Sequence, residues 1–408
     1  MAADDMVVGL DIGTSKVTAV IAEPQSNGLP EIIGVGTAPS SGLRRGVVIN
    51  IEATLRSVVD AIEAAEQMAG REVKQVISGI AGNHISGMNS SGVVAVTSRG
   101  REITEADVSR VIENAQAVSI PMDREVLHVI PRNFVIDEQG GIKNPLDMIG
   151  VRLEVEVHMI TGSVTAAQNL VKCVNRAGFE IRQMAFNSIA ASEAVLSQDE
   201  RELGVLLIDI GAGTTNVMIY QDGAPFHSFV LPVGGSQVTG DLSIMLKTSM
   251  ESAEKIKHED GCAYQALVEE GEPVLVPGVG GRAPMQCTRQ QICEIVQPRM
   301  TEIFGLVRER LDRYRMLDRV AGGLVLTGGG ARLPGVVELG QDIFDLGGRI
   351  GLPGRYGGLV DKYQSPEFST AVGLVLYAMR EGIVTSGVTK ERKSGAIKSL
   401  GRWVRHFF

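Results

Sequence analysis

Two short stretches place an aspartate, glycines and hydroxyl side chains between apolar strands. Residues 7–21 read VVGLDIGTSKVTAVI, and residues 206–220 read LLIDIGAGTTNVMIY. Glycines in such a turn let a ligand approach the backbone, and the turn presents N–H groups that suit an anion. An aspartate beside the turn suits the magnesium that accompanies a phosphate chain. The pattern predicts two phosphate-binding hairpins.

The repetition of the hairpin indicates how the chain is organised. One copy opens each half of the chain, and the first copy is expected to have one residue fewer in its turn. Two copies predict two similar domains that face each other across a cleft. A single copy could be an ordinary turn, but an aspartate in the same place twice favours a binding role. The residues expected at the ligand are Asp11, Gly13, Thr14, Ser15 and Lys16 in the first hairpin, and Asp209, Gly211, Gly213, Thr214, Thr215 and Asn216 in the second.

A third glycine loop follows a buried strand near residue 327. It contains Gly328, Gly329 and Gly330, with Arg332 shortly after them. Three consecutive glycines let a flat ligand lie against bare backbone. The two DxG hairpins and the GGG loop together resemble the actin/Hsp70/sugar-kinase ATPase superfamily. The resemblance implies an α/β, actin-like two-domain ATPase fold, with duplicated mixed-sheet domains around a nucleotide cleft. It also implies ATP in that cleft, with Mg²⁺ held through water by Asp11 and Asp209.

Composition supports a globular protein with at least two domains. The chain has 408 residues, of which 44% are hydrophobic and 21% charged. This length and balance are typical of folded multidomain chains. The four cysteines form no CxxC pair and the histidines form no HExxH motif, so we expect a cytosolic protein with reduced thiols and no structural zinc. The acidic start is unlike a signal peptide, and no apolar run reaches about 18 residues.

The elements between the motifs predict an insertion in the first domain. Residues 53–69 have helical spacing and end at Gly70, and residues 73–80 read as a buried strand. From about residue 84 to 161 short strands, expected at 92–97, 126–130, 133–136 and 151–160, surround one helix, at 104–117, which predicts a small inserted α+β unit. The alternative is that these strands continue the parent sheet.

The inserted stretch carries a second resemblance. Residues 126–137, VLHVIPRNFVID, and 141–146, GIKNPL, resemble the FtsA family of bacterial cell-division proteins, and the resemblance covers essentially the whole chain. It implies subdomain 1A at 6–83 and 162–200, an inserted subdomain 1C at 84–161, subdomain 2A at 203–245 and 306–380, and subdomain 2B at 246–305.

Further cleft residues follow from the superfamily resemblance. Gly234 and Gly235 start a helix whose N–H groups would face the nucleotide. Glu254 and Lys257 lie on one helix face and would grip ribose and adenine; the alternative is a surface ion pair. Glu193, in the helix that connects the halves, would orient the attacking water; the alternative is a solvated glutamate. The family is at most a weak ATPase.

The family resemblance also places a partner on the 2B lobe. In the family this lobe holds the C-terminal tail of FtsZ. Arg289, Arg299 and Glu302, on a long helix expected at 288–316, are the residues predicted to contact it. Composition alone would describe them as solvated charges.

The C-terminal stretch differs from the rest of the chain. Residues 387–408 carry six Lys and Arg against one acidic residue, although the whole chain has a net charge of −9. An acidic body argues against nucleic-acid binding, and a basic tail indicates a localised interaction. Residues 381–394 read as a flexible linker and 395–408 as an amphipathic helix. Its apolar stripe is Ile397, Leu400, Trp403, Val404, Phe407 and Phe408, with Lys398, Arg402 and Arg405 beside it.

This tail is typical of a helix that lies in the interface of an anionic membrane. The alternative is a helix that docks on the body of the protein or on a partner. Together with these features, the family resemblance implies an ATP-binding protein that polymerises, anchors FtsZ to the inner face of the cytoplasmic membrane at the septum, and recruits downstream divisome proteins through subdomain 1C. The alternatives are a sugar kinase and another actin-like scaffold, of the MreB or pilus-assembly kind.

Overall fold

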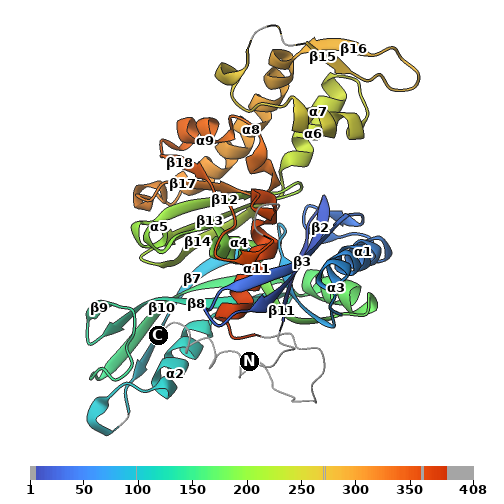
Figure 1. The fold of residues 1–408 in the computed structure, drawn as a ribbon. Coiled ribbons are helices and arrows are strands. Elements are labelled where there is room, and N and C mark those ends of the chain that lie inside the picture. Colours follow the sequence, from blue (N-terminus) through green and yellow to red (C-terminus); the bar gives the residue numbers. More distant parts are fainter. Residues whose placement is uncertain (1–5, 98, 270, 272, 360–362, 384–408) are drawn as a thin grey trace.

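The structure, a computed structural model, describes residues 6–97, 99–269, 271, 273–359 and 363–383. The predicted linker beyond residue 383 and the predicted membrane helix at 395–408 lie outside the described residues. Two α/β domains are stacked, with an inserted domain at one end and an outer lobe at the other (Figure 1). Among the described helices, none is long and apolar enough to cross a membrane.

The first domain is built on a six-stranded mixed sheet of order β11-β6-β1-β2-β3-β19. Its strands are β1 (Val7–Ile12), β2 (Lys16–Pro24), β3 (Pro30–Pro39), β6 (Gln75–Ile80), β11 (Glu180–Phe186) and β19 (Gly357–Gly358), and a small hairpin adds β4 (Leu43–Arg44) and β5 (Val47–Val48). Its helices are α1 (Ile51–Ala69), α3 (Val164–Arg176) and α4 (Asn187–Val195), whereas α5 (Gln198–Leu203), which follows α4 in the chain, packs against β13 (Thr215–Gln221) of the second domain. Gly70 ends α1 in the left-handed region at φ 63°, as the sequence predicted, because glycine adopts this conformation without steric cost.

The second domain repeats this topology. The order β17-β12-β13-β14 matches β6-β1-β2-β3, with one parallel pair followed by two antiparallel hairpins. The elements are β12 (Val205–Ile210), β13 (Thr215–Gln221), β14 (Ala224–Leu231), β17 (Leu324–Thr327), β18 (Gly348–Ile350) and α9 (Val336–Phe344). Both β1 and β12 are almost wholly buried. The duplication predicted from the two DxG stretches is therefore present in the fold.

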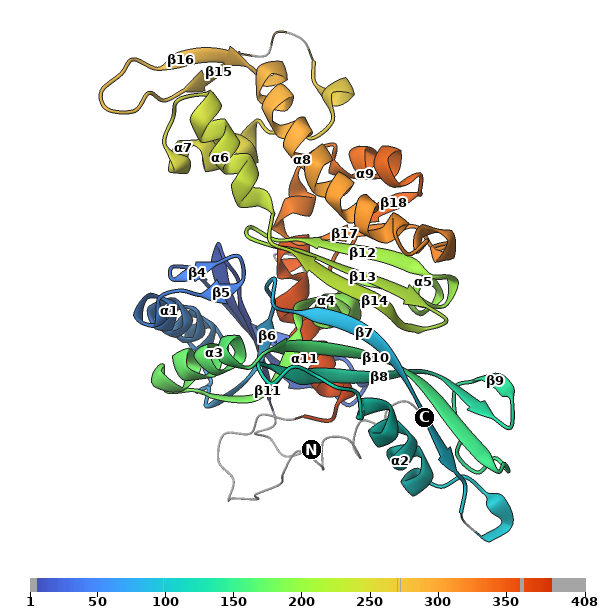
Figure 2. The same ribbon diagram turned by 180° about the vertical axis from the view of Figure 1, so that it is seen from behind.

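The inserted domain does not continue the sheet of the first domain. Its elements are β7 (Ser86–Ala95), α2 (Glu105–Gln116), β8 (Arg124–Ile136), β9 (Gln139–Ile142) and β10 (Arg152–Ser163). Its sheet, β7-β10-β8-β9, joins the sheet of the second domain through a single β14–β7 pair, Phe229 with Ser86. Figure 2 shows β7, β10 and β8 below β14. The two strands expected at 126–130 and 133–136 are one strand, β8, with a bulge between them.

The outer lobe contains α6 (Gly235–Met245), α7 (Met250–Glu259), β15 (Pro273–Val276), β16 (Met285–Thr288) and the start of α8 (Arg289–Asp312). Because α6 packs against α7 and α8, it belongs to this lobe, although the predicted boundary left it in subdomain 2A. The last helix, α11 (Ser369–Arg380), was also predicted in 2A. It packs instead against α4 and β1 of the first domain and contributes Leu374 and Tyr377 to that core.

Candidate nucleotide site

The two sheets direct the ends of their parallel strands at one cleft. In the first domain, β1, β6 and β11 are parallel, and Asp11 and Asn187 lie at two of their carboxyl ends. In the second domain, β12 and β17 are parallel and end at Asp209 and Gly328. Ligands of α/β sheets bind outside the carboxyl ends of the strands. The cavity between them has a volume of about 240 Å³ and is lined by both domains and the outer lobe.

The two hairpins have the same turn geometry. The N–H of Gly13 donates to the carbonyl of Lys16 at 3.0 Å, and the N–H of Gly211 donates to the carbonyl of Thr214 at 2.9 Å. Ile12 pairs with Val17 as Ile210 pairs with Thr215. The prediction that the first turn is one residue shorter is therefore wrong, because both turns hold the same number of residues between paired positions.

Both turns keep donors available to a ligand. Among the described residues, no hydrogen bond uses the N–H groups of Thr14 and Ser15, or those of Ala212 and Gly213. Successive N–H groups in a turn form a concave site for an anion. Two such turns at one cavity suit a chain of several phosphate groups.

The two aspartates are buried and carry strongly raised pKa values. Burial, with the charge of Asp209 as the next cause, raises the pKa of Asp11 to about 7. Burial raises the pKa of Asp209 to about 6, against a hydrogen bond from Asn216. Two carboxylates that resist ionisation in one cavity are stabilised by a cation between or beside them.

Two amide oxygens next to the aspartates lack partners. Asn187 donates to Asp11 at 3.3 Å and Asn216 donates to Asp209 at 3.0 Å, while the buried side-chain oxygen of each asparagine finds no hydrogen-bond donor among the described residues. A hydrated divalent cation would supply donors to these oxygens and charge to the aspartates. The donor set therefore fits Mg²⁺ bound through water. The described residues contain no cluster of three or more His, Cys, Asp or Glu for direct ligation.

The glycine loop is held directly against the second hairpin. Gly328 has φ 81°, and a side chain at this position would overlap the Asp209 carboxylate. A side chain at Gly330 would overlap Ile210. Glycine is therefore required for this close approach, and the loop leaves bare backbone on the cavity wall.

The outer lobe closes the cavity with a polar cluster. Lys257 lies 2.8 and 2.7 Å from the two Glu254 oxygens, Thr239 also bonds Glu254, and His258 lies 3.1 Å from it. Burial alone would raise the pKa of Glu254, but the hydrogen bonds from Lys257 and Thr239 lower it. The cluster is therefore a charged wall of the cleft and not only a surface pair, and it adjoins apolar Met300.

Two cations of the cleft share one carboxylate. Lys16 lies 3.2 Å from Glu367 and 4.1 Å above the ring of Phe368, while Arg332 lies 3.1 Å from the other oxygen of Glu367. A phosphate group that bound Lys16 would compete with Glu367 for it.

Most of the predicted cleft residues line this one cavity. They are Asp11, Gly13, Thr14, Ser15, Lys16, Asp209, Gly211, Gly213, Thr214, Asn216, Gly235, Glu254, Lys257, Gly328, Gly329, Gly330 and Arg332. Thr215 does not line it, since its hydroxyl donates to the carbonyl of Val233.

The glycine pair at the start of α6 has a different role from the one predicted. The N–H of Gly235 donates to the carbonyl of Gly211, and the N–H of Ser236 donates to that of Ala212. A side chain at Gly234 would overlap the carbonyl of Gly211. These donors are therefore occupied, and the pair fixes α6 against the hairpin instead of offering N–H groups to an anion.

Glu193 does not reach the cleft. Its carboxylate lies 3.2 Å from Arg201 and 2.6 Å from Arg380, and it is only 8% exposed. Burial alone would raise the pKa of Glu193, but the charges of Arg380 and Arg201 outweigh it and hold the pKa low. The structure does not support the water-orienting role expected of Glu193, because both of its strong interactions are structural ion pairs.

Sequence reasoning missed other cleft residues, among them Asn187, His258, Met300 and Glu367. The position of Asn187 could have been predicted, because a polar residue directly after a buried parallel strand lies at the carboxyl ends of the strands, where ligands bind. Glu367 had none, since its position depends on how η5 (Pro366–Phe368) packs beside the glycine loop.

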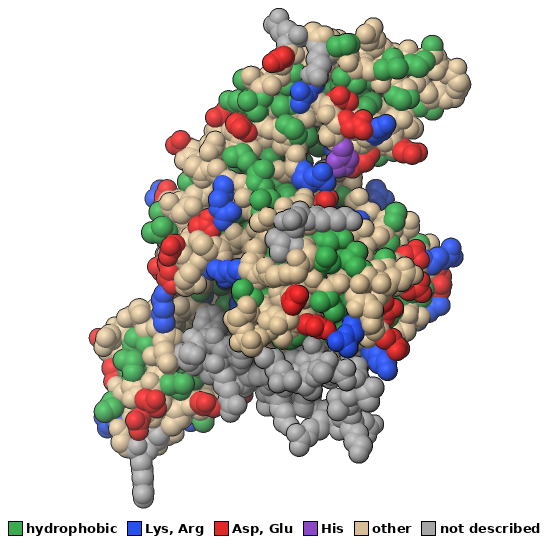
Figure 3. Space-filling view, viewed as in Figure 1, with side chains coloured by type: hydrophobic (Ala, Val, Ile, Leu, Met, Phe, Trp, Pro, Cys, Tyr) green, Lys and Arg blue, Asp and Glu red, His purple; other side chains and the backbone are tan. Residues whose placement is uncertain are grey.

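The predicted FtsZ contacts lie on α8, away from the cavity lining. Arg299 pairs with both oxygens of Asp241, at 2.5 and 3.0 Å, and with Glu302. Arg289 donates to the carbonyl of Asp260 at 3.2 Å. On the face seen in Figure 3, acidic and basic side chains are interspersed over both domains.

The fold and the cleft define the class of the protein. A solved structure of the PilM-PilN type IV pilus biogenesis complex superposes with a TM-score of 0.66 at 17% identity, covering 91% of this chain and 98% of that chain. MreB5 of Spiroplasma citri bound to ADP gives a TM-score of 0.56 at 15% identity, over 91% and 95% of the two chains. The chain has the actin-like ATPase fold, as its sequence predicted.

Closer relatives define the family. A family model described as "Cell division protein FtsA" matches residues 206–373, and one described as "SHS2 domain inserted in FTSA" matches residues 82–161. Cell division protein FtsA of Pseudomonas aeruginosa is 44% identical, over 99% of this chain and 98% of its own length. That of Escherichia coli K12 is 40% identical, over 99% and 98%. The chain belongs to the FtsA family of cell-division proteins.

Proposed function

We propose that the cleft binds ATP with Mg²⁺. The observation that carries this proposal is the meeting of two aspartate hairpins with free N–H donors, whose aspartates have raised pKa values and adjoin unpartnered amide oxygens. The hairpins and Lys16 would hold the phosphates, and Asp11 and Asp209 would hold the hydrated metal. Gly328–Gly330, Glu254 and Lys257 would contact the nucleoside. The bound metal would neutralise phosphate charge.

Hydrolysis in this cleft is at most slow. Orienting the attacking water requires a polar group within hydrogen-bond reach of it. Glu193 is held by two arginines outside the cavity lining. Asp11 and Asp209 are assigned to the hydrated metal, and the polar side chain beside Asp11 is Asn187, a neutral amide that orients water without accepting its proton. The nucleotide therefore serves mainly to bring the two domains together and to favour polymerisation with further copies of the chain.

We further propose that the chain is a membrane adaptor for the division ring. The outer lobe would hold the C-terminal tail of FtsZ through the surface around Arg289, Arg299 and Glu302. The C-terminal segment 395–408 would lie in the anionic inner face of the cytoplasmic membrane at the septum, as a peripheral anchor. The inserted domain would recruit downstream divisome proteins. Family membership supports this role, as does the basic, amphipathic tail.

The raised pKa values give a pH-dependent test of the ATP and Mg²⁺ proposal. Asp11 and Asp209 bind protons more tightly in the folded, empty cleft than in the unfolded chain, where they titrate near 3.8. The empty protein therefore loses stability as pH rises from about 4 to about 7, because the folded state must give up protons that it binds tightly. Bound Mg²⁺ replaces those protons. We expect Mg-ATP, at saturating Mg²⁺, to raise the melting temperature more at pH 8 than at pH 5.5.

The control is the Asp209→Asn chain, since ATP itself titrates in this range. The variant retains only one of the two titrating carboxyls, so its pH dependence should be much weaker in the same scanning-calorimetry series. An increase in melting temperature that is equal at both pH values, or larger at pH 5.5, would contradict a metal bound beside the two aspartates.

A further inference from the structure

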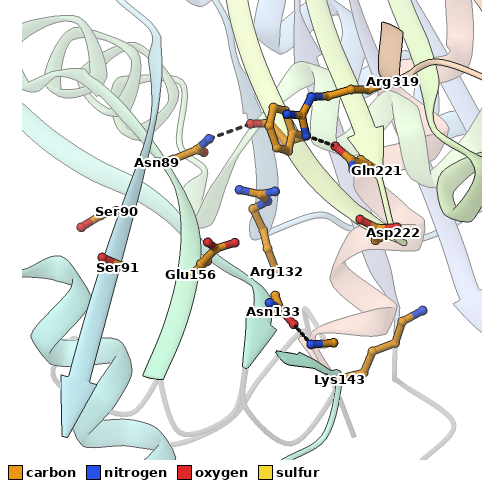
Figure 4. Close-up of a pocket in the computed structure, with 12 residues that line it drawn as sticks. Asn89, Ser90, Ser91, Arg132, Asn133, Lys143, Glu156, Gln221, Asp222 and Arg319 are labelled. Atoms are coloured by element: carbon orange, nitrogen blue, oxygen red, sulfur yellow. Dashed lines mark hydrogen bonds between the residues drawn. The ribbon is translucent and has the colours of Figure 1, made fainter. Parts of the chain in front are cut away.

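A second, larger cavity lies between the inserted domain and the second domain. Its volume is about 780 Å³, and Figure 4 shows its lining. Arg132, Asn133 and Glu156 come from β8 and β10, whereas Asp222, Phe226 and Arg319 come from the second domain. None of the described residues predicted for nucleotide or FtsZ contacts lines it.

A β-bulge directs Arg132 into this cavity. On β8, Asn133 pairs with Glu156 of β10, but the next pair along is Pro131 with Val157. Arg132 is therefore the extra residue of the bulge. Bulges change the direction of a side chain and are common beside functional sites. In Figure 4 the Arg132 guanidinium points to the centre of the lining residues.

The Arg132 guanidinium lacks an acceptor within the part of the chain that the structure describes. Among the described residues it makes no hydrogen bond or ion pair, and its Nε is buried without a partner. It lies 4.2 Å from the ring centre of Phe226, and Arg319 lies 4.7 Å from the same ring. Arg319 is satisfied by Gln221 at 3.1 Å. Stacking on Phe226 thus holds the Arg132 guanidinium in place, while its N–H groups make no hydrogen bond to the described residues. A planar guanidinium can donate two parallel hydrogen bonds to a carboxylate.

Burial lowers the pKa of Arg132, although the side chain stays charged. Burial and the nearby Arg319 lower its pKa, while Glu156 and Asp222 raise it. An arginine remains charged under these conditions. A half-buried cation without an acceptor is costly, so the cavity favours an anionic ligand group.

The adjacent strand β7 offers an open edge. β7 pairs with β14 only at Ser86, opposite Phe229. Beyond Ser86, β7 pairs with β10 alone among the described strands. Three consecutive residues, 89–91, border the cavity. Successive side chains of a strand point to opposite faces of the sheet. A cavity that is bordered by three consecutive residues therefore lies beside the edge of the strand.

The outward backbone groups of β7 can be assigned. Val93 donates its N–H to the side chain of Asn114, away from β10. Every second residue of an antiparallel strand directs its N–H and C=O to the same side. The backbone groups of Asn89 and Ser91 therefore also face away from β10, towards the gap beside β14. The side-chain amide of Asn89 spans this gap and donates a hydrogen bond to the carbonyl of Phe226. An extended peptide can add to such an edge.

We propose that this cavity binds an extended peptide segment of a partner protein, which pairs with the open edge of β7 and places a carboxylate on Arg132. The site deepens the proposed recruitment of partners by the inserted domain and rests on that part of the proposed function. It is independent of ATP, of FtsZ and of the C-terminal segment. We propose a peptide and not a free anion because only a peptide would pair with the backbone N–H and C=O groups at the open edge of β7.

The test is selection of random heptapeptides displayed on phage against the full chain, with depletion on the Arg132→Gln chain. We expect the retained peptides to share an acidic residue. In fluorescence anisotropy, a selected peptide should bind Arg132→Gln at least tenfold more weakly, and its own Glu-to-Gln version should show the same loss. Glu156→Gln should bind it several-fold more tightly, because that substitution removes a nearby negative charge that repels the carboxylate of the peptide.

Arg110→Gln is the matched control, since it removes an arginine of the same domain that pairs with Asp107 on α2. It should bind the peptide as the unmodified chain does. Mg-ATP stabilisation, measured on every variant, should be unchanged, so that failure of the nucleotide proposal is seen separately. No retained peptides, retained peptides without a carboxylate, or equal binding by Arg132→Gln would overturn the proposal. So would an Arg132→Gln chain whose only defect is loss of self-association in sedimentation, which would make the cavity a contact between copies.

Discussion

The Asp209→Asn chain should bind Mg-ATP on the order of 100-fold more weakly than the unmodified chain, since a hydrogen bond to a charged group contributes about 1.5–3 kcal/mol. The substitution removes one of two buried carboxylates at the cleft while preserving the shape of the side chain. Asn216 at 3.0 Å and the glycine at position 328 leave room for the amide. Isothermal titration with Mg-ATP measures the effect directly.

The same substitution should not destabilise the empty protein. The pKa of Asp209 is raised to about 6 by burial, so at pH 8 the folded state carries a charge that the cleft disfavours. The amide carries none, and the empty variant should melt at or above the temperature of the unmodified chain. Asp199→Asn, on exposed α5, is the control and should leave binding unchanged. Undiminished Mg-ATP affinity in a folded Asp209→Asn chain would refute the metal assignment.

Removal of the residues after Ser394 should abolish binding to anionic vesicles. The removed segment contains Lys398, Arg402 and Arg405, and each cation near an anionic leaflet contributes about 1 kcal/mol. Loss of these charges and of the apolar stripe predicts at least about a 100-fold fall in vesicle affinity. Vesicle co-sedimentation measures it.

A substitution pair separates the apolar stripe from the charge. Trp403→Ala with Phe407→Ala keeps the three cations and should still release the chain from vesicles. His406→Ala, beside the stripe, is the matched control and should remain bound. Because Trp403 is the only tryptophan, its emission should shift to the blue with anionic vesicles and remain unshifted with neutral ones. Equal retention of the shortened and full chains would exclude this segment as the anchor.

The sequence predicted the fold and most of the cleft because glycines and aspartates at strand ends have few alternative roles. Asp11 and Asp209 lie at equivalent positions, and Gly328 and Gly330 are required by close contacts with the second hairpin. Periodicity also placed α1 and α2, and Thr104 forms a capping box at the start of α2.

The errors came from contacts between distant segments. Glu193 is a helix glutamate in sequence, and only the tertiary fold brings Arg201 and Arg380 to it. α11 follows the second domain in the chain but packs on the first. The bulge at Arg132 was hidden, because Pro131 made one strand read as two. Local sequence patterns do not predict which sheet an inserted domain will join.

The measurement that tests the adaptor role most directly is capture of a fluorescent FtsZ C-terminal tail peptide on anionic vesicles by the full chain with Mg-ATP. The comparison is a chain that ends at Ser394. We expect the full chain to bring the peptide to the vesicles, and the shortened chain to bind the peptide in solution without sedimenting it. If the full chain binds vesicles but does not capture the peptide, the chain is not an FtsZ adaptor and the contacts proposed at Arg289, Arg299 and Glu302 are wrong.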